Sequence, residues 1–480
     1  MISAAKASYM VRKKRKLNPY LLLMLSFLGI VLIGSFLLSM PFAFKESHGR
    51  WCATGSYLDA FFTALGAMTL TGLTTYPQGL AATLSPAGQI IVLVLVQIGG
   101  LGIVTILTFL FSIFKKKLQF KERLTISQAI AFNNFSEIAR YVRRLIIISL
   151  TCEAIGIGLG VPLFLHITGG NVAKTIYYSA FYAISSFNNA GFDLFNGSSA
   201  LMVSDLFATN NFLYYYSTAY LSVLSLLGGI SFLVIIDIVI GHKLPRSWSS
   251  FTKICLTMTV GLIVVMSGLL FLTDGMKSEN PMSVYQAFSQ IIYCRTSGFA
   301  VYPQDQISLP GRMICAVMML IGGSPLSTAG GIKVTTAFII ILAVISYFRG
   351  KRLSAFKRRY SYDLVAKSMS LVFIVVAFIF LSFICLVAFG TKNVEGYTLS
   401  ENIAKDKVSF YMYEVFSCFG NVGFQTGIEP VLAPGSKIVL CLLMLVGHLG
   451  PMAFFQIFQN HLDKNANVHY SFVEEDFLIG

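Results

Sequence analysis

Long runs of apolar residues alternate with short polar connections along the whole chain. Each run can cross a hydrocarbon core of about 30 Å as an α-helix that rises ~1.5 Å per residue. The pattern therefore predicts an all-α polytopic membrane protein with eight membrane-crossing helices. These helices are expected near residues 20–43, 87–114, 143–167, 212–241, 254–273, 312–347, 364–390 and 436–459.

A shorter, half-apolar segment lies between the two spans of each successive pair. These segments are too short to cross a membrane, and they are expected as short helices at 57–68, 174–187, 281–294 and 408–419. Each one leads into a small, polar, glycine-containing stretch. The four stretches are Thr69-Leu70-Thr71-Gly72, Asn188-Asn189-Ala190-Gly191, Arg295-Thr296-Ser297-Gly298 and Gly420-Asn421-Val422-Gly423.

This fourfold recurrence predicts four M1–pore helix–M2 repeats, with eight transmembrane helices and four pore helices in a pseudo-four-fold arrangement around one pore. The expected organisation is a cytoplasmic basic tail at 1–19, repeat 1 at 20–118, repeat 2 at 139–243, repeat 3 at 251–350, repeat 4 at 363–462 and a cytoplasmic tail at 463–480.

Composition and charge exclude most other classes of protein. Apolar residues make up 55% of the 480 residues and charged residues only 12%, about half the ~25% of a soluble domain. The net charge of +15 comes from basic clusters between the apolar spans, which places both termini in the cytoplasm by the positive-inside rule. Aromatic residues do not interleave with one basic face, so nucleic acid is not an expected partner. Seven of the eight cysteines lie inside apolar stretches and are expected to be free.

The four glycine stretches carry the chemistry. Non-helical backbone at membrane depth must be buried in protein or line water. Backbone carbonyls on a common axis can replace the hydration shell of a monovalent cation, and glycine permits positive φ and close approach of the strands. The alternative, that these glycines only permit close helix contacts, is weak for four stretches in register.

These motifs resemble the Trk/Ktr/HKT superfamily of potassium transporters, and most closely the membrane subunit of the bacterial Ktr system. The resemblance rests on residues 69–72, 186–192, 295–299, 321–333, 419–424, 447–451 and 474–480. It implies a potassium filter with one glycine from each repeat, and four glycines imply potassium selectivity. It also implies a homodimer on a cytoplasmic ring of nucleotide-binding regulatory subunits. The basic loops are candidate docking surfaces for that ring, although positive-inside topology and anionic lipid explain most of them.

The apolar span 312–347 is interrupted by a stretch rich in small residues. A proline in a helix interior costs ~3 kcal/mol, so an intact helix is not expected there. A kinked helix stays open as an alternative to an intramembrane gating loop at 322–331, which the resemblance implies. The candidate gate residues are Gly322, Gly323, Ser324, Pro325, Ser327, Thr328, Gly330, Gly331, Lys333 and His448.

Charged or titratable residues inside the membrane need partners. Lys333 either points toward the cytoplasmic interface or lies on the pore. Arg295 is expected to anchor its glycine stretch, with Glu414 proposed as its partner. His448 stands where the family commonly has arginine. If the fixed charge of that arginine supports gating, His448 puts this gating function in doubt or makes it pH-dependent. A neutral, hydrogen-bonded His448 is the expected state. Glu153 and Asp237 are expected to be paired.

The sequence thus predicts a non-enzymatic subunit for potassium uptake across the plasma membrane. Sodium remains open as an activator or coupled ion. The main alternative is a secondary transporter with broken helices that moves another monovalent cation or couples potassium to sodium. A membrane-embedded enzyme or scaffold would be a third class, but the chain has no nucleotide-cradling loop or metalloprotease motif.

Overall fold

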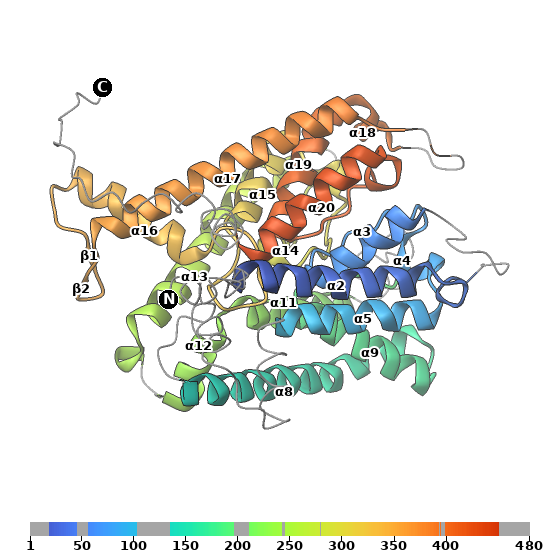
Figure 1. Cartoon of the computed structure of the whole chain (residues 1–480), viewed down its shortest axis with the longest axis horizontal. Helices are drawn as coiled ribbons and strands as arrows, with labels where there is room; N and C mark the ends of the chain where they lie inside the picture. Colours follow the sequence, from blue (N-terminus) through green and yellow to red (C-terminus); the bar gives the residue numbers. More distant parts are fainter. Residues whose placement is uncertain are drawn as a thin grey trace, which may run out of the picture.

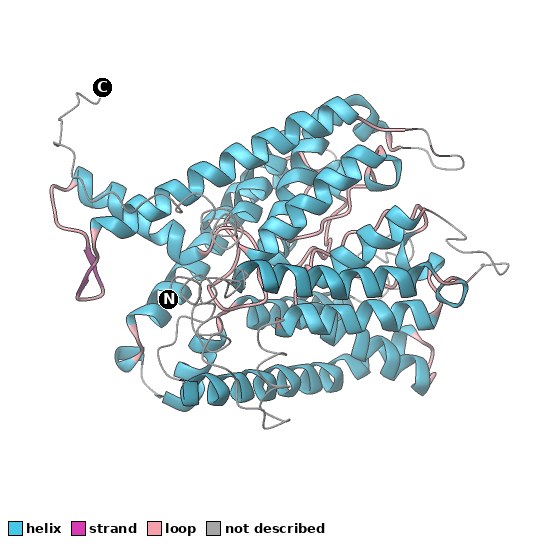
Figure 2. Ribbon diagram, in the orientation of Figure 1, coloured by secondary structure: helices cyan, strands magenta, loops and turns pink. Residues whose placement is uncertain are grey.

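The computed structural model describes residues 19–45, 56–102, 135–195, 211–241, 245–278, 280–392, 394 and 399–450. Both predicted tails, the basic residues near 115–123, Cys52 and the far ends of the spans 87–114 and 436–459 lie outside these residues. The described chain is almost entirely helical, apart from one short hairpin (Figure 2).

Helices occupy the apolar runs and the shorter segments between them. The first helix of each pair is α2 (Pro19–Ser39), α8 (Phe135–Ile167), α13 (Ser250–Leu270) or α17 (Tyr362–Phe389). The short helices are α3 (Tyr57–Met68), α9 (Val172–Phe187), α14 (Val284–Thr296) and α19 (Lys407–Gly420). The second helices are α5 (Pro86–Leu101), α11 (Asn211–Gly229), α15 (Leu309–Leu320) and α20 (Pro434–Leu449).

The remaining elements connect these helices. They are η1 (Pro41–Ala43), α4 (Gly79–Thr83), α12 (Phe232–Ile236), η2 (Asp237–Gly241), η3 (Pro245–Ser247), η4 (Phe271–Gly275), η5 (Gln304–Gln306), α16 (Val334–Phe348), α18 (Glu401–Lys405) and η6 (Glu429–Val431). The hairpin pairs β1 (Ser354–Ala355) with β2 (Arg358–Arg359) in antiparallel register, Ser354 opposite Arg359.

Length and composition qualify three of the described helices to cross a membrane: Val142–Ile167, Ser250–Gly275 and Tyr362–Phe389. The predicted continuous span 212–241 is wrong, because Phe212–Gly229 and Phe232–Val239 meet at 97°. The bend follows Gly228 and Gly229, which are poor helix formers. A hydrogen bond from the backbone N–H of Phe232 to the carbonyl of Leu326, at 3.2 Å, stabilises this bend.

The helices pack so that the short ones lie inside the long ones. Helix α2 packs on α3 and α5, α8 packs on α9, and α17 packs on α19 and α20 (Figure 1). The long helix α17 turns Phe373 and Phe380 outward, with 76% and 62% of their surface exposed. Large apolar side chains on the outer face fit a hydrocarbon surrounding.

The start of each short helix is set by a polar cap in the sequence. Ser56 forms a capping box with Asp59, and Ser283 forms one with Gln286. Asn171 and Asp406 accept hydrogen bonds from backbone N–H groups in the first turns of α9 and α19. The caps satisfy backbone donors at the outer ends, so the apolar carboxyl ends can be buried among the other helices.

Candidate ion pathway

The carboxyl ends of the four short helices converge on four glycine loops, 69–72, 188–191, 295–298 and 420–423. The glycines are interlocked in a ring. A Cβ atom built on Gly72 would lie 2.0 Å from the carbonyl oxygen of Ala190, and one on Gly191 would lie 2.3 Å from that of Ser297. The corresponding distances are 2.2 Å from Gly298 to Val422 and 1.3 Å from Gly423 to Thr71. Each glycine thus faces the carbonyl just before the next glycine, and the fourth loop closes on the first.

All four glycines have positive φ, between 65° and 82°. Three loops also hold a non-glycine residue in the left-handed region two positions earlier: Leu70, Asn189 and Asn421. Such residues are uncommon and cost energy unless their surroundings hold them. In the third loop the corresponding Thr296 is still helical, because α14 extends to that residue.

Side chains on the inner ends of the loops tie them to one another. The Nδ2 atom of Asn421 donates to the hydroxyl of Thr71 at 2.8 Å, which links the fourth loop to the first. Ser225 of α11 donates to the Oδ1 atom of Asn189 at 2.6 Å. The hydroxyls of Thr69 and Thr71 lie 2.8 Å apart. This part of the ring is therefore fixed by buried hydrogen bonds.

A cavity of about 480 Å³ opens on the other side of the ring. Gly191, Gly298 and Gly423 form its floor, and the segments that follow them form its walls. Three acidic residues, Asp193, Asp305 and Glu429, are part of the lining. Acidic groups around the mouth of a narrow passage favour cations electrostatically.

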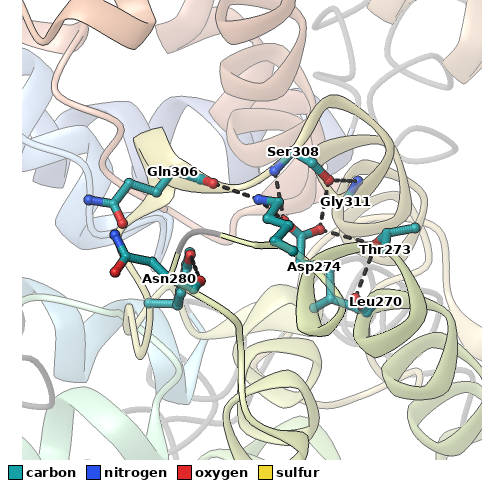
Figure 3. Close-up of polar contacts among 9 residues, drawn as sticks. Leu270, Thr273, Asp274, Asn280, Gln306, Ser308 and Gly311 are labelled. Carbon is teal, nitrogen blue, oxygen red and sulfur yellow. Dashed lines mark hydrogen bonds and ion pairs between the residues drawn. The ribbon is translucent and has the colours of Figure 1, made fainter.

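The segment that follows the repeat 3 wall of this cavity is held by Asp274 of η4 (Figure 3). Its carboxylate accepts hydrogen bonds from the backbone N–H and the hydroxyl of Ser308, both at 2.8 Å, and from the Thr273 hydroxyl at 3.0 Å. Lys277 forms an ion pair with Asp274 and donates to the carbonyl of Gln306 at 2.8 Å. The buried carboxylate is fully satisfied, so this cluster is an anchor for the loop that precedes α15.

The second helices end in a common way, which the sequence motifs indicated only in repeats 3 and 4. Aligned glycines stand at 99, 228, 322 and 447, followed by Gly100, Gly229, Gly323 and His448. A Cβ atom on Gly99, Gly228 or Gly447 would lie about 2 Å from the last or near-last carbonyl of a short helix, that of Met68, Phe187 or Phe419. Glycine there permits the second helix to pass close beneath the short helix.

Residues 321–333 form a loop between α15 and α16, rather than a kinked helix. Backbone hydrogen bonds join the two ends of the loop, from Gly322 to Ile332 at 2.9 Å and from Val334 to Gly323 at 3.1 Å. The middle of the loop inserts into the bend of repeat 2, where the N–H and hydroxyl of Thr328 both donate to the carbonyl of Gly228.

The same loop contacts the inner ends of two glycine loops. Asn189 donates to the hydroxyl of Thr328 at 2.9 Å. A Cβ atom on Gly330 would lie 2.4 Å from the Oδ1 atom of Asn421 and 2.8 Å from the carbonyl of Gly420. Ser324 is buried, whereas Pro325 and Ser327 are half-buried, and Gly331 has a φ of 68°. The loop therefore crosses from repeat 2 to repeat 4 directly beneath the ring.

The predicted pairing of Arg295 with Glu414 is wrong. Arg295 is buried, and its Nη2 atom donates to the carbonyl of Gly229 at 3.1 Å. This places the guanidinium against the bend of repeat 2 and away from α19. Lys333 turns back on its own loop, where its Nζ atom lies 2.5 Å from the carbonyl of Ala329. Asp237 accepts hydrogen bonds from Ser249 and Thr252, as a paired acid should.

His448 reaches the first glycine loop. Its Nδ1 atom lies 3.1 Å from the carbonyl oxygen of Thr69, and its ring centroid lies 5.3 Å from that of Phe27. At the equivalent position in repeat 1, a Cβ on Gly100 would meet the side chain of Asn188 at 1.8 Å. In repeat 1 the small residue Gly100 faces the larger Asn188. In repeat 4 the large residue His448 faces the smaller Thr69.

Two buried polar clusters behind the ring were not predicted as a whole. Glu153 of α8 accepts hydrogen bonds from Gln97, Ser149 and Asn188, the first residue of the second glycine loop. Lys437 of α20 pairs with Asp59 of α3 at 2.5 Å, and their side chains are 5% and 13% exposed. Glu153 and Lys437 lie in or beside apolar runs of the sequence, and this pattern could have predicted buried polar clusters.

The helical bundle, with three described helices long and apolar enough to cross a membrane and large apolar side chains on its outer face, is that of a polytopic membrane protein. The chain matches the TrkH family, described as cation transport protein, over residues 32–470. It belongs to this family, which confirms the resemblance that the motifs predicted. The family and the relatives below are transport proteins rather than enzymes.

Two curated relatives align over nearly the whole chain. The chain is 30% identical to the potassium/sodium uptake protein NtpJ of Enterococcus hirae, over 98% of this chain and 99% of the relative. It is 28% identical to the Ktr system potassium uptake protein B of Bacillus subtilis, over 95% and 96%. Its fold is similar to the crystal structure of the potassium transporter TrkH from Vibrio parahaemolyticus, with a TM-score of 0.65 at 16% identity over 93% and 86% of the two chains.

Proposed function

We propose that the chain moves potassium across the plasma membrane through a selectivity filter made of the four glycine loops. The observation that carries this proposal is the closed ring in which each glycine faces the carbonyl before the next glycine. Four carbonyl-bearing strands at this separation can replace the hydration shell of a monovalent cation. Potassium is favoured because it is the ion that the names of both relatives share.

The ring favours four M1–pore helix–M2 repeats around one pore over a secondary transporter with two related halves. A transporter of that kind needs a substrate site between two repeats, formed by broken helices at the midplane. Here all four loops contribute equivalent atoms to one ring, and three of the four glycines line the acidic cavity. Sodium is a second ion to be tested, because the Enterococcus relative is named for both ions.

The loop 321–333 serves as the gate beneath this filter. Its contacts with Asn189 and Asn421 support the proposal, because they lie at the inner ends of two filter loops. Small residues let the loop leave its seat without the packing cost of large side chains, and its polar groups can meet pore water. His448, held at the carbonyl of Thr69, borders the same passage.

The remaining parts of the proposal concern assembly. We infer a homodimer with both termini in the cytoplasm, regulated by a cytoplasmic nucleotide-binding subunit. The support is the likeness to proteins named as components of a Ktr system and the basic character of the predicted inner loops. Surrounding lipid contacts the exposed apolar face of the bundle.

A flux experiment tests the transport proposal directly. The purified protein is reconstituted into vesicles, and uptake of radiolabelled potassium is measured with and without sodium and in competition with sodium. We expect saturable potassium uptake that sodium inhibits weakly. Uptake of neither ion, or equal uptake of both, would contradict a potassium filter. Expression in cells that lack potassium uptake gives the matching test in vivo.

A further inference from the structure

Each short helix holds the outward continuation of its own glycine loop through a buried polar side chain. In repeat 1, Thr75 donates to Asp59 at 2.8 Å. In repeat 2, Tyr182 donates to Asp193. In repeat 3, the Nε2 atom of Gln290 donates to the Oε1 atom of Gln304 at 3.0 Å. Each of these three pairs matches a donor with an acceptor.

Repeat 4 places two carboxyl groups where repeat 3 has two amides. Glu414 of α19 and Glu429 of η6 are buried, with 0% and 1% of their surface exposed. Thr426 joins them, because its N–H donates to the Oε1 atom of Glu429 at 2.9 Å and its hydroxyl donates to the Oε1 atom of Glu414 at 2.6 Å. Both carboxyl groups therefore bind the same threonine and lie in one buried site.

Two ionised carboxylates cannot hydrogen-bond to each other, since both are acceptors only. Like charges in one buried site also cannot both persist, as in other dyads of carboxyl groups. Among the ion pairs of the described residues, none includes Glu414 or Glu429. One proton must therefore be held between the two groups.

The proton belongs on Glu414. Glu429 accepts backbone N–H groups on both oxygens, from Thr426 and from Gly427 at 2.9 Å, which stabilises its ionised form. The Oε2 atom of Glu414, in contrast, is buried without a hydrogen-bond partner in the described part of the chain when it is treated as ionised. Burial, and after it the neighbouring Glu429 carboxylate, raise the pKa of Glu414 well above its usual range.

We propose that Glu414 and Glu429 form a proton-binding pair in which protonated Glu414 donates to Glu429 and so positions the outer end of the fourth filter loop. Glu414 is a positioning residue that does not touch the ion. The inference rests on the proposed function, because it assumes that the glycine loops are the filter.

The pair acts together with a second anchor on the same helix face. Ser417, three residues after Glu414, accepts the backbone N–H groups of Gly423 and Phe424 at 3.0 and 3.1 Å. Ser417 thus holds the glycine itself, whereas Glu414 holds the segment that follows it. Loss of the proton would replace an attraction by a repulsion, and the wall of the outer cavity at Thr426 would move away from α19.

The other ionisable groups around the pair do not supply a competing charge. The Glu414 carboxylate acts electrostatically on Tyr413 and Cys418 of α19, and burial above all raises the pKa of both well above the usual range. Those two are in turn affected by Cys294, Arg312, Cys315 and Cys441. Arg312 is already paired with Asp406 at 3.1 Å.

Infrared difference spectroscopy on the purified protein tests the proton without any transport. We expect the carbonyl band of a protonated carboxylic acid at neutral pH, lost on raising the pH and missing in Glu414→Gln. Glu401→Gln is the matched control, since Glu401 is an exposed carboxylate of the same repeat. Identical spectra for the wild type and Glu414→Gln would overturn the proposal.

Vesicle flux tests the positioning role. Potassium-over-sodium selectivity of the wild type should fall as the external solution becomes alkaline. Glu414→Gln, whose side-chain amide can donate to Glu429 as Gln290 donates to Gln304 in repeat 3, should keep the selectivity at every pH. Glu414→Ala should lower it about tenfold at neutral pH, the effect of losing one charge-assisted hydrogen bond. Glu414→Gln and Glu414→Ala that both match the wild-type pH profile would overturn it. A wild type that moves no potassium would instead contradict the proposed function, while the infrared result would still stand.

Discussion

Replacing Gly423 with alanine perturbs the ring at its tightest contact. The new Cβ atom would lie 1.3 Å from the carbonyl oxygen of Thr71, and real Cβ atoms essentially never come closer than 3.0 Å to such a neighbour. The Thr71 carbonyl or the Gly423 backbone would therefore have to move by about 1.7 Å. A displacement of this size separates the fourth loop from the first.

The backbone conformation alone contributes a smaller effect. Gly423 has a φ of 82°, and a residue with a side chain in the left-handed region costs roughly 1–2 kcal/mol. Gly170 offers a matched control, because its φ is 88° and nothing lies within 4 Å of a Cβ atom built on it. Gly170→Ala should show the backbone cost in thermal stability and leave ion selectivity unchanged.

Selectivity measured by competition between potassium and sodium in vesicles separates the two variants. A ring that loses one coordinating carbonyl should discriminate at least about tenfold less well, which corresponds to ~1.4 kcal/mol. Gly72→Ala, Gly191→Ala and Gly298→Ala should behave like Gly423→Ala. Folded variants at all four positions with wild-type selectivity would refute the reasoning, and so would a loss of selectivity in Gly170→Ala.

Three further predictions concern the loop 321–333 and two buried charge clusters, those of Asp59 and Asp274. Deletion of Ser324 to Ala329 should raise potassium flux and lessen dependence on a regulatory partner, as flux measured with a well-expressed variant will show; normal, still-regulated flux would contradict a gate. Asp59→Asn should lower the free energy of unfolding by about 3–5 kcal/mol, because it leaves Lys437 buried without its partner. Adding Lys437→Met should recover much of this loss in the same thermal-unfolding experiment. Asp274→Ala should lower the free energy of unfolding by about 1–3 kcal/mol, since it leaves the buried donors at the start of α15 unsatisfied. An unchanged melting temperature would argue against this anchor.

The sequence determined the helical class and the positions of most helices. Apolar runs of sufficient length leave few alternatives to helices in lipid, because every backbone polar group must be satisfied within the segment. Polar caps such as Ser56 and Ser283 mark where the short helices begin. The fourfold recurrence of glycine stretches was also visible, because it depends only on residue type and order.

The sequence did not determine how the repeats contact one another. The bend at Gly228 and Gly229 was hidden in a continuous apolar run, and its stabilising partner, Leu326, is distant in the chain. A proline and four glycines exposed the equivalent break in repeat 3, while the glycine pair at 99–100 was too weak a signal alone.

Side-chain partners across the bundle were decided by the tertiary structure alone. Arg295 donates to a backbone carbonyl instead of pairing with Glu414, and Glu414 shares Thr426 with another carboxyl group, that of Glu429. A charged residue inside an apolar run predicts a partner for its side chain, because desolvation is costly. For a buried cation, a backbone carbonyl can be that partner as well as a side chain can. Which one is near depends on the packing of helices from different repeats, and no local pattern records that packing.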